Sequence, residues 1–106
     1  MTLGELYQYR DLEAEIMEDR ARLEKLSGGE YDELLAGIKT KIARRNAKLR
    51  RAYNFVERIP DAYTRRIFKL RFIDGLSWNC LAHKIGGTTA DAARMTVKRY
   101  LREKNR

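Results

Sequence analysis

The apolar residues of positions 1–59 recur at alternating steps of three and four, a spacing that belongs to helices and to no strand. Two such series lie on either side of the Ser27-Gly28-Gly29 segment. The first consists of Tyr9, Leu12, Ile16, Leu23 and Leu26, and the second of Leu35, Ile38, Ile42, Leu49, Ala52, Val56 and Ile59. This spacing is typical of a coiled-coil seam. We therefore predict helices over residues 3–26 and 31–58, joined by a short loop into an antiparallel hairpin.

One polar residue interrupts each series. Asp19 takes the missing step of the first series, and Arg45 takes that of the second. If Leu26 of the first helix packs against Leu35 of the second next to the loop, the following residues of the two series also lie opposite one another in layers. Asp19 and Arg45 are then one layer apart. The two side chains could then form an ion pair, or each could extend into water, and the spacing does not distinguish these outcomes.

A third helix is expected between Pro60 and Ile73. The residue before a proline is disfavoured in helical geometry, so the second helix ends at Ile59, and Pro60 can open the next one. The inward stripe is expected to be Tyr63, Ile67 and Leu70, flanked by Phe68, Phe72 and Ile73. No segment shows the alternation of a strand, and the predicted fold class is all-α.

The segment from Leu76 to Leu101 predicts two helices joined by a tight turn. Ser77 can cap the first, Gly86 can end it in the left-handed αL conformation, and Thr88 or Thr89 can cap the second. On the second helix one side holds Ala93, Val97, Tyr100 and Leu101, and the other holds Asp91, Arg94, Met95, Lys98, Arg99 and Arg102. This cationic outer face favours a DNA-binding helix-turn-helix, although a helical hairpin with a solvated charged face shows the same pattern.

The run from Ile59 to Leu101 resembles the region 4 domain of sigma-70-type RNA polymerase sigma factors. The residues that carry the resemblance are Pro60, Leu70 to Phe72, Asp74 to Trp78, and the pairs Leu81-Ala82 and Ile85-Gly86. It is most similar to the small sigma-like regulators of phages and prophages. The resemblance implies a promoter-like DNA target and contact with RNA polymerase. The turn after Ile85 is one residue longer than in typical sigma domains, which leaves the register of the second helix open by one residue.

The charge is unevenly distributed along the chain. Residues 1–36 carry ten acidic and four basic side chains, a net charge of −6, whereas residues 37–106 carry five acidic and nineteen basic ones, a net charge of +14. A localised excess of Lys and Arg favours an anionic partner. The basic run from Lys39 to Arg51 is spread around its predicted helix. We therefore interpret it as a solvated face that partly neutralises the acidic first helix, with an extended nucleic-acid surface as the alternative.

Residues typical of catalysis or metal binding are sparse. His83 is the single histidine and Cys80 the single cysteine, and neither has partners for a zinc site, which needs about four ligands. We expect Cys80 to be a small buried residue, His83 to be exposed, and Trp78 to anchor the core. A lone cysteine and the absence of a signal sequence or a long apolar run predict a cytoplasmic protein with no membrane contact. We predict no enzyme activity, no metal and no cofactor.

These observations predict a long antiparallel helical hairpin over residues 1–59 and a three-helix helix-turn-helix domain of sigma region 4 type over residues 60–106. The expected partner is double-stranded DNA. The base-reading candidates are Asp91, Arg94 and Lys98, and the DNA-backbone candidates are Thr88, Thr89, Arg99 and Arg102. RNA polymerase is a second expected partner, and a homodimer could form through residues 3–58. The alternatives are a polymerase-binding adaptor without its own DNA site and a small packaging-terminase subunit.

Overall fold

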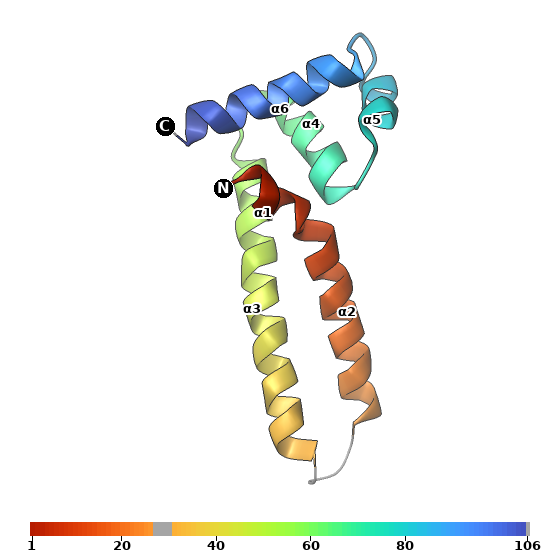
Figure 1. Ribbon diagram of the computed structural model, residues 1–106, viewed down its shortest axis with the longest axis vertical. Helices are drawn as coiled ribbons and strands as arrows, with labels where there is room; N and C mark the ends of the chain where they lie inside the picture. Colours follow the sequence, from red (N-terminus) through yellow and green to blue (C-terminus); the bar gives the residue numbers. More distant parts are fainter. Residues whose placement is uncertain (27–30, 106) are drawn as a thin grey trace.

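The computed structural model describes residues 1–26 and 31–105, and all regular elements in these ranges are helical (Figure 1). The elements are α1 (Leu3–Tyr7), α2 (Tyr9–Lys25), α3 (Asp32–Glu57), α4 (Ala62–Phe68), the π-helical segment η2 (Lys69–Ile73), α5 (Trp78–Ile85) and α6 (Ala90–Lys104). The predicted all-α class is therefore confirmed. The molecule measures 57 × 30 × 18 Å. The predicted helix break at Ser27-Gly28-Gly29 lies outside the described residues.

Helices α2 and α3 run antiparallel and side by side along the long axis of the molecule (Figure 1). Ile16 of α2 and Ile38 and Ile42 of α3 form a buried cluster between them. Three partly buried residues pack against it, Leu23, Leu26 and Leu49. Every member of this cluster belongs to the three-four series of the sequence, so the predicted seam is the face that the two helices share.

Asp19 and Arg45 form an ion pair within this seam. Asp19 is only 4% exposed, and its carboxylate accepts hydrogen bonds from the guanidinium groups of Arg45 and Arg22. Arg45 also contacts Glu15, with 2.9 Å between Nε and the carboxylate. The alternative in which both side chains extend into water does not occur. A carboxylate at this depth needs such partners, because a buried and unpaired charge costs several kcal/mol.

The first helix does not run unbroken over residues 3–26, so that prediction is wrong at Gln8, where α1 ends and α2 follows. Thr2 caps α1 reciprocally with Glu5, and the bond from the Thr2 backbone lowers the pKa of the Glu5 carboxyl below its usual value. Beyond the break α1 turns away from the axis of α2 (Figure 1). Leu6 thereby reaches a second core, where it is 1% exposed.

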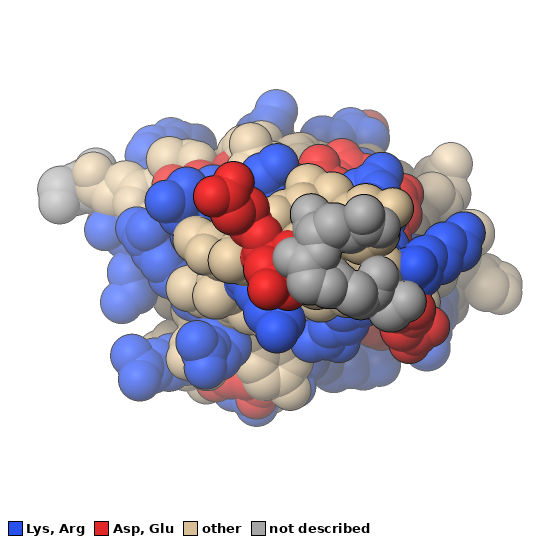
Figure 2. Space-filling model, turned by 90° about the horizontal axis from the view of Figure 1, so that it is seen from below, with Lys and Arg blue, Asp and Glu red and all other residues tan. Residues whose placement is uncertain are grey.

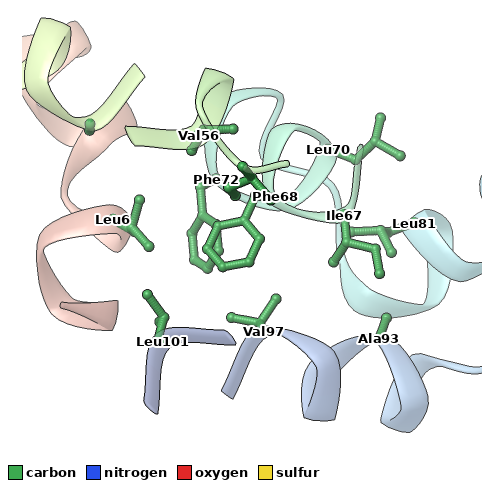
Figure 3. Packing of buried hydrophobic residues seen from close by; sticks show 12 residues of the cluster. Leu6, Val56, Ile67, Phe68, Leu70, Phe72, Leu81, Ala93, Val97 and Leu101 are labelled. Carbon is green, nitrogen blue, oxygen red and sulfur yellow. The ribbon is translucent and has the colours of Figure 1, made fainter. Parts of the chain in front are cut away.

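This second core joins α1 and the end of α3 to the C-terminal helices (Figure 3). Its buried members are Leu6, Ala52, Val56, Ile59, Ile67, Phe68, Leu70, Phe72, Leu81, Ala93, Val97 and Leu101. The fully buried Phe68 ring lies 5.5 Å, between centroids, from the rings of Phe72 and Tyr100. The packing is therefore continuous across the boundary predicted between residues 59 and 60.

The start of the third predicted helix differs from expectation. Pro60 was predicted to open it, but Pro60 lies outside α4 and Asp61 is the N-cap. The Thr64 backbone N–H donates to the Asp61 carboxylate at 2.9 Å, and this bond lowers the pKa of Asp61 below its usual value. The carboxylate satisfies a backbone donor that the helix start leaves free, which favours a start after Asp61.

The inward face of this helix also differs. Tyr63 was predicted to face inward but is 41% exposed, whereas the expected flanking residues Phe68 and Phe72 are buried. Tyr63 and Phe68 lie in α4, whereas Phe72 lies in the π-helical turn that follows, in which the Asp74 N–H bonds to the Lys69 carbonyl at 2.9 Å. This wider turn accommodates an extra residue, so the side chains after it point in directions that a regular α-helix would not give.

Candidate nucleic-acid interface

Helix α5 begins as the sequence predicts. Ser77 Oγ accepts the backbone N–H of Cys80 at 3.1 Å, and Leu81 and Ala82 face the second core. The interpretation of Cys80 as a buried residue is wrong, since its side chain is exposed. Leu81 and Ala82 occupy the inward face, so the position before them turns outward. His83 is exposed, as expected.

The turn between α5 and α6 requires glycine. Gly86 has φ 76° and ψ 153°, and Gly87 has φ 67°. The predicted positive φ at Gly86 is confirmed, but its ψ lies far from the αL value, so the αL assignment is wrong. This region of positive φ and extended ψ is nearly closed to residues that have a Cβ.

Replacing Gly86 by alanine is expected to lower the free energy of unfolding by roughly 1–3 kcal/mol, because of this backbone strain. No atom lies within 4 Å of a Cβ built at Gly86, so steric overlap adds nothing. Gly37→Ala adds the same methyl group in open space within α3, and should raise stability by about 0.5–1 kcal/mol. Thermal unfolding measures both, and an unchanged melting temperature for Gly86→Ala would contradict the turn conformation.

The two threonines after the turn have different partners. Thr89 is the N-cap of α6, and its Oγ1 accepts the Ala92 N–H at 3.1 Å. Thr88 Oγ1 lies 2.9 Å from the hydroxyl of Tyr63, which ties the turn to α4. The sequence left the cap open between these two residues, and the structure selects Thr89.

Helix α6 has one buried face and one exposed face. Ala93, Val97 and Leu101 are buried in the second core (Figure 3). The outer face of α6 carries the exposed residues Asp91, Met95, Lys98, Arg99 and Arg102. Tyr100 packs edge-on against Phe55 and Phe68, and this desolvation raises the pKa of its hydroxyl above the ordinary value. Five of the six residues of the predicted outer face are thus exposed.

Arg94 lies at the edge of this face and is held by two neighbours. Its Nη1 donates to Asp91 Oδ1 at 2.6 Å, and its guanidinium carbon lies 5.6 Å from the centroid of the Trp78 ring. Two of the predicted base-reading residues, Asp91 and Arg94, are therefore in direct contact. Lys98 lies further along the same face.

Trp78 is half-buried at the start of α5, where it packs against the second core as predicted. The sequence did not indicate its cationic neighbours. Arg71 of η2 lies 4.7 Å from the Trp78 ring centroid, in addition to Arg94. No local sequence pattern could have predicted the contact between Arg71 and Trp78, because the path of the loop after η2 decides which side chain lies against the Trp78 ring.

Two cations of the basic run of α3 contact carboxylates of the N-terminal segment. From the end of the molecule at which α2 ends and α3 begins, Lys and Arg are scattered over the surface, with Asp and Glu among them (Figure 2). Arg45 contacts Glu15 at 2.9 Å, and Arg51 approaches Glu5 at 3.9 Å. These contacts fit the interpretation that α3 partly neutralises the acidic N-terminal segment.

Within the described ranges, no three His, Cys, Asp or Glu side chains are grouped so that they could hold a metal ion. None of the helices in these ranges combines the length and apolar character that crossing a bilayer requires. Comparison of the chain with protein-family models, with curated proteins and with solved structures finds no match.

Proposed function

We propose that this protein is a sequence-specific regulator of transcription that binds double-stranded DNA, with α5 and α6 acting as a helix-turn-helix. The observation that carries the proposal is the division of α6. One face is buried in the core, and the opposite face is exposed and carries Lys98, Arg99 and Arg102. A helix anchored in this way can enter the major groove, where the base edges are accessible.

In this proposal the residues of α6 have separate roles. Asp91, Arg94 and Lys98 read base edges from the first turns of the helix, because those turns lead into the groove. Arg99 and Arg102 contact phosphates, as does Thr89 at the helix start. Thr88 was a further backbone candidate, but its hydrogen bond with Tyr63 makes it the weakest of this group.

The resemblance of residues 59–101 to sigma region 4 supports a role in transcription, with RNA polymerase as a second partner in the cytoplasm of a phage-infected or prophage-carrying cell. A polymerase-binding adaptor and a small packaging-terminase subunit remain the alternatives. Binding to polymerase without affinity for any duplex would favour the adaptor. A ring-shaped oligomer in native mass spectrometry would favour the packaging role.

A homodimer through residues 3–58 is also part of the proposal. Met17, Leu34 and Tyr53 are exposed on α2 and α3 and are available to a second copy. Leu6 is not, because the second core buries it within one chain, and this reduces the apolar area that a partner could cover. Sedimentation at micromolar concentration tests the dimer, and a monomer of 12.5 kDa would remove it.

Selection of bound sequences from a pool of random duplexes tests the proposed function directly. We expect one preferred sequence, and Arg94→Ala should relax the preference at one base pair by roughly 1–3 kcal/mol. Arg102→Ala is the matched control, since the loss of a phosphate contact weakens binding to all sequences alike. Quantitative binding to duplexes that differ at single positions measures both effects. A pool that shows no enrichment would refute the function.

A further inference from the structure

Four side chains from four separate elements form a continuous stack that ends at the outer face of α6. We call Tyr7, Arg71, Trp78 and Arg94 the aromatic–arginine stack. The Arg71 guanidinium carbon lies 5.2 Å from the Tyr7 ring centroid and 4.7 Å from that of Trp78. The Arg94 guanidinium lies 5.6 Å from the same Trp78 ring. Each cation lies within the distance at which the negative face of an aromatic ring attracts it.

Arg71 is the fixed centre of this stack. Its Nη1 donates to the Leu76 carbonyl at 2.9 Å, and its Nη2 donates to the Tyr7 hydroxyl at 3.3 Å. Its Nε is buried and has no hydrogen-bond partner among the described residues. An unpaired buried donor is unfavourable. The contacts of Arg71 with the two rings and its other two hydrogen bonds offset that cost and hold its guanidinium in position.

The N-terminal segment holds the same region from the other side. Arg10 Nη1 donates to the carbonyls of Ile73 and Asp74 at 3.2 and 2.9 Å, at the end of η2. Gly75 follows with φ 76°, and an added Cβ there would lie 2.6 Å from the Arg10 side chain. The loop that leads from η2 to Trp78 is thus held by Arg10 of α2, more than sixty positions away in the sequence.

Arg94 is the exposed end of the stack. Trp78 covers one face of its guanidinium, and Asp91 occupies one donor, Nη1. Its other N–H donors have no hydrogen-bond partner among the described residues, and the side chain is 41% exposed. A free arginine side chain loses rotamer freedom when it binds, whereas one already held in place loses less.

We propose that Trp78 and Asp91 are positioning residues, which hold Arg94 in the orientation that donates two hydrogen bonds to a guanine, while Arg71 and Tyr7 fix the Trp78 ring. This inference rests on the proposed DNA-binding function and names how its specificity arises. This replaces the base-reading role given to Asp91 in the proposed function, since Asp91 then acts through Arg94. The acidic N-terminal helices contribute to specificity although they carry no cationic binding face.

The test compares Trp78→Leu, Trp78→Phe, Asp91→Asn and Arg94→Ala in the full chain. The readout is the ratio of affinities for the preferred duplex and for the duplex changed at the base pair that Arg94→Ala relaxes. We expect Trp78→Leu and Asp91→Asn each to reduce this ratio at the same base pair, by about tenfold for Trp78→Leu. Trp78→Phe keeps an aromatic face and should retain most of the discrimination. A change that only loosened the fold would lower both affinities and leave the ratio unaltered.

A second readout needs no DNA. Trp78 is the single tryptophan of the chain, so its fluorescence reports its neighbours directly. Arg94→Ala should shift the emission of the free protein, and Asp91→Asn should shift it in the same direction. If Trp78→Leu does not fold, Asp91→Asn still tests the inference, because Asp91 is exposed. Discrimination that depends on Arg94 but is unchanged in Asp91→Asn and Trp78→Leu would overturn this inference alone, whereas no duplex binding at all would refute the proposed function.

Discussion

Raising the salt concentration from about 50 to about 200 mM is expected to weaken duplex binding by roughly a hundredfold. The cations of α6 that can reach DNA are Arg94, Lys98, Arg99 and Arg102. Each phosphate that they neutralise releases condensed counterions, and this release becomes less favourable as salt rises. Fluorescence anisotropy of a labelled duplex, titrated at several salt concentrations, measures the dependence.

Matched charge changes locate the surface responsible for it. Arg102→Gln should reduce the slope of log affinity against log salt concentration by about 1, because one phosphate contact is lost. Lys41→Gln removes the same charge from an exposed position on α3 and should leave the slope unaltered. Affinity that is flat with salt, or equal slopes for both variants, would show that α6 is not the anion-binding surface.

Replacing Arg45 by leucine is expected to lower the free energy of unfolding by roughly 2–3 kcal/mol. The change leaves the Asp19 carboxylate buried between α2 and α3, with the exposed Arg22 as its remaining partner. We expect a smaller loss in the free energy of unfolding than for a fully buried ion pair, because the Arg45 side chain is 25% exposed. The double variant Asp19→Leu/Arg45→Leu should regain this stability, since a buried ion pair can be replaced by packed apolar side chains.

Thermal and denaturant unfolding, followed by the helical circular-dichroism signal, measure the members of this cycle. Arg44→Leu is the control for loss of an arginine, because Arg44 is exposed beside Arg45 and its replacement should change stability by less than about 0.5 kcal/mol. If the stability lost in the double variant equalled the sum of the losses in Asp19→Leu and Arg45→Leu, Asp19 and Arg45 would not be energetically coupled.

Elements that depend on neighbours within one or two helical turns could be predicted from the sequence. The helix predicted over residues 31–58 lies within one residue of the observed ends of α3, Asp32 and Glu57. The cap at Ser77 and the positive φ of Gly86 are equally local, because a cap needs a side-chain oxygen at the helix start and a left-handed turn needs a missing Cβ. The two faces of α6 follow from spacing alone, since Ala93, Val97 and Leu101 recur four residues apart.

Packing between segments that are distant in the sequence sets where helices break and which partners long side chains contact. The chain breaks at Gln8, where α1 turns toward a core that the end of α3 and the C-terminal helices complete. The π-helical turn contains the buried Phe72, whose direction no regular period predicts. From the sequence alone, Asp19 and Arg45 could either pair or extend into water. The structure buries Asp19, and a buried carboxylate requires a charged partner.

The same division applies to the candidate site. The exposed cations of α6 were visible in the sequence because surface position follows from helical spacing. The stack that holds Arg94 was not, since Tyr7, Arg71 and Trp78 lie on different elements and meet only when α1, η2 and α5 pack together. An arginine side chain has several rotatable bonds and accepts many orientations in isolation, so its direction is set by the rings and carboxylates that the fold brings beside it.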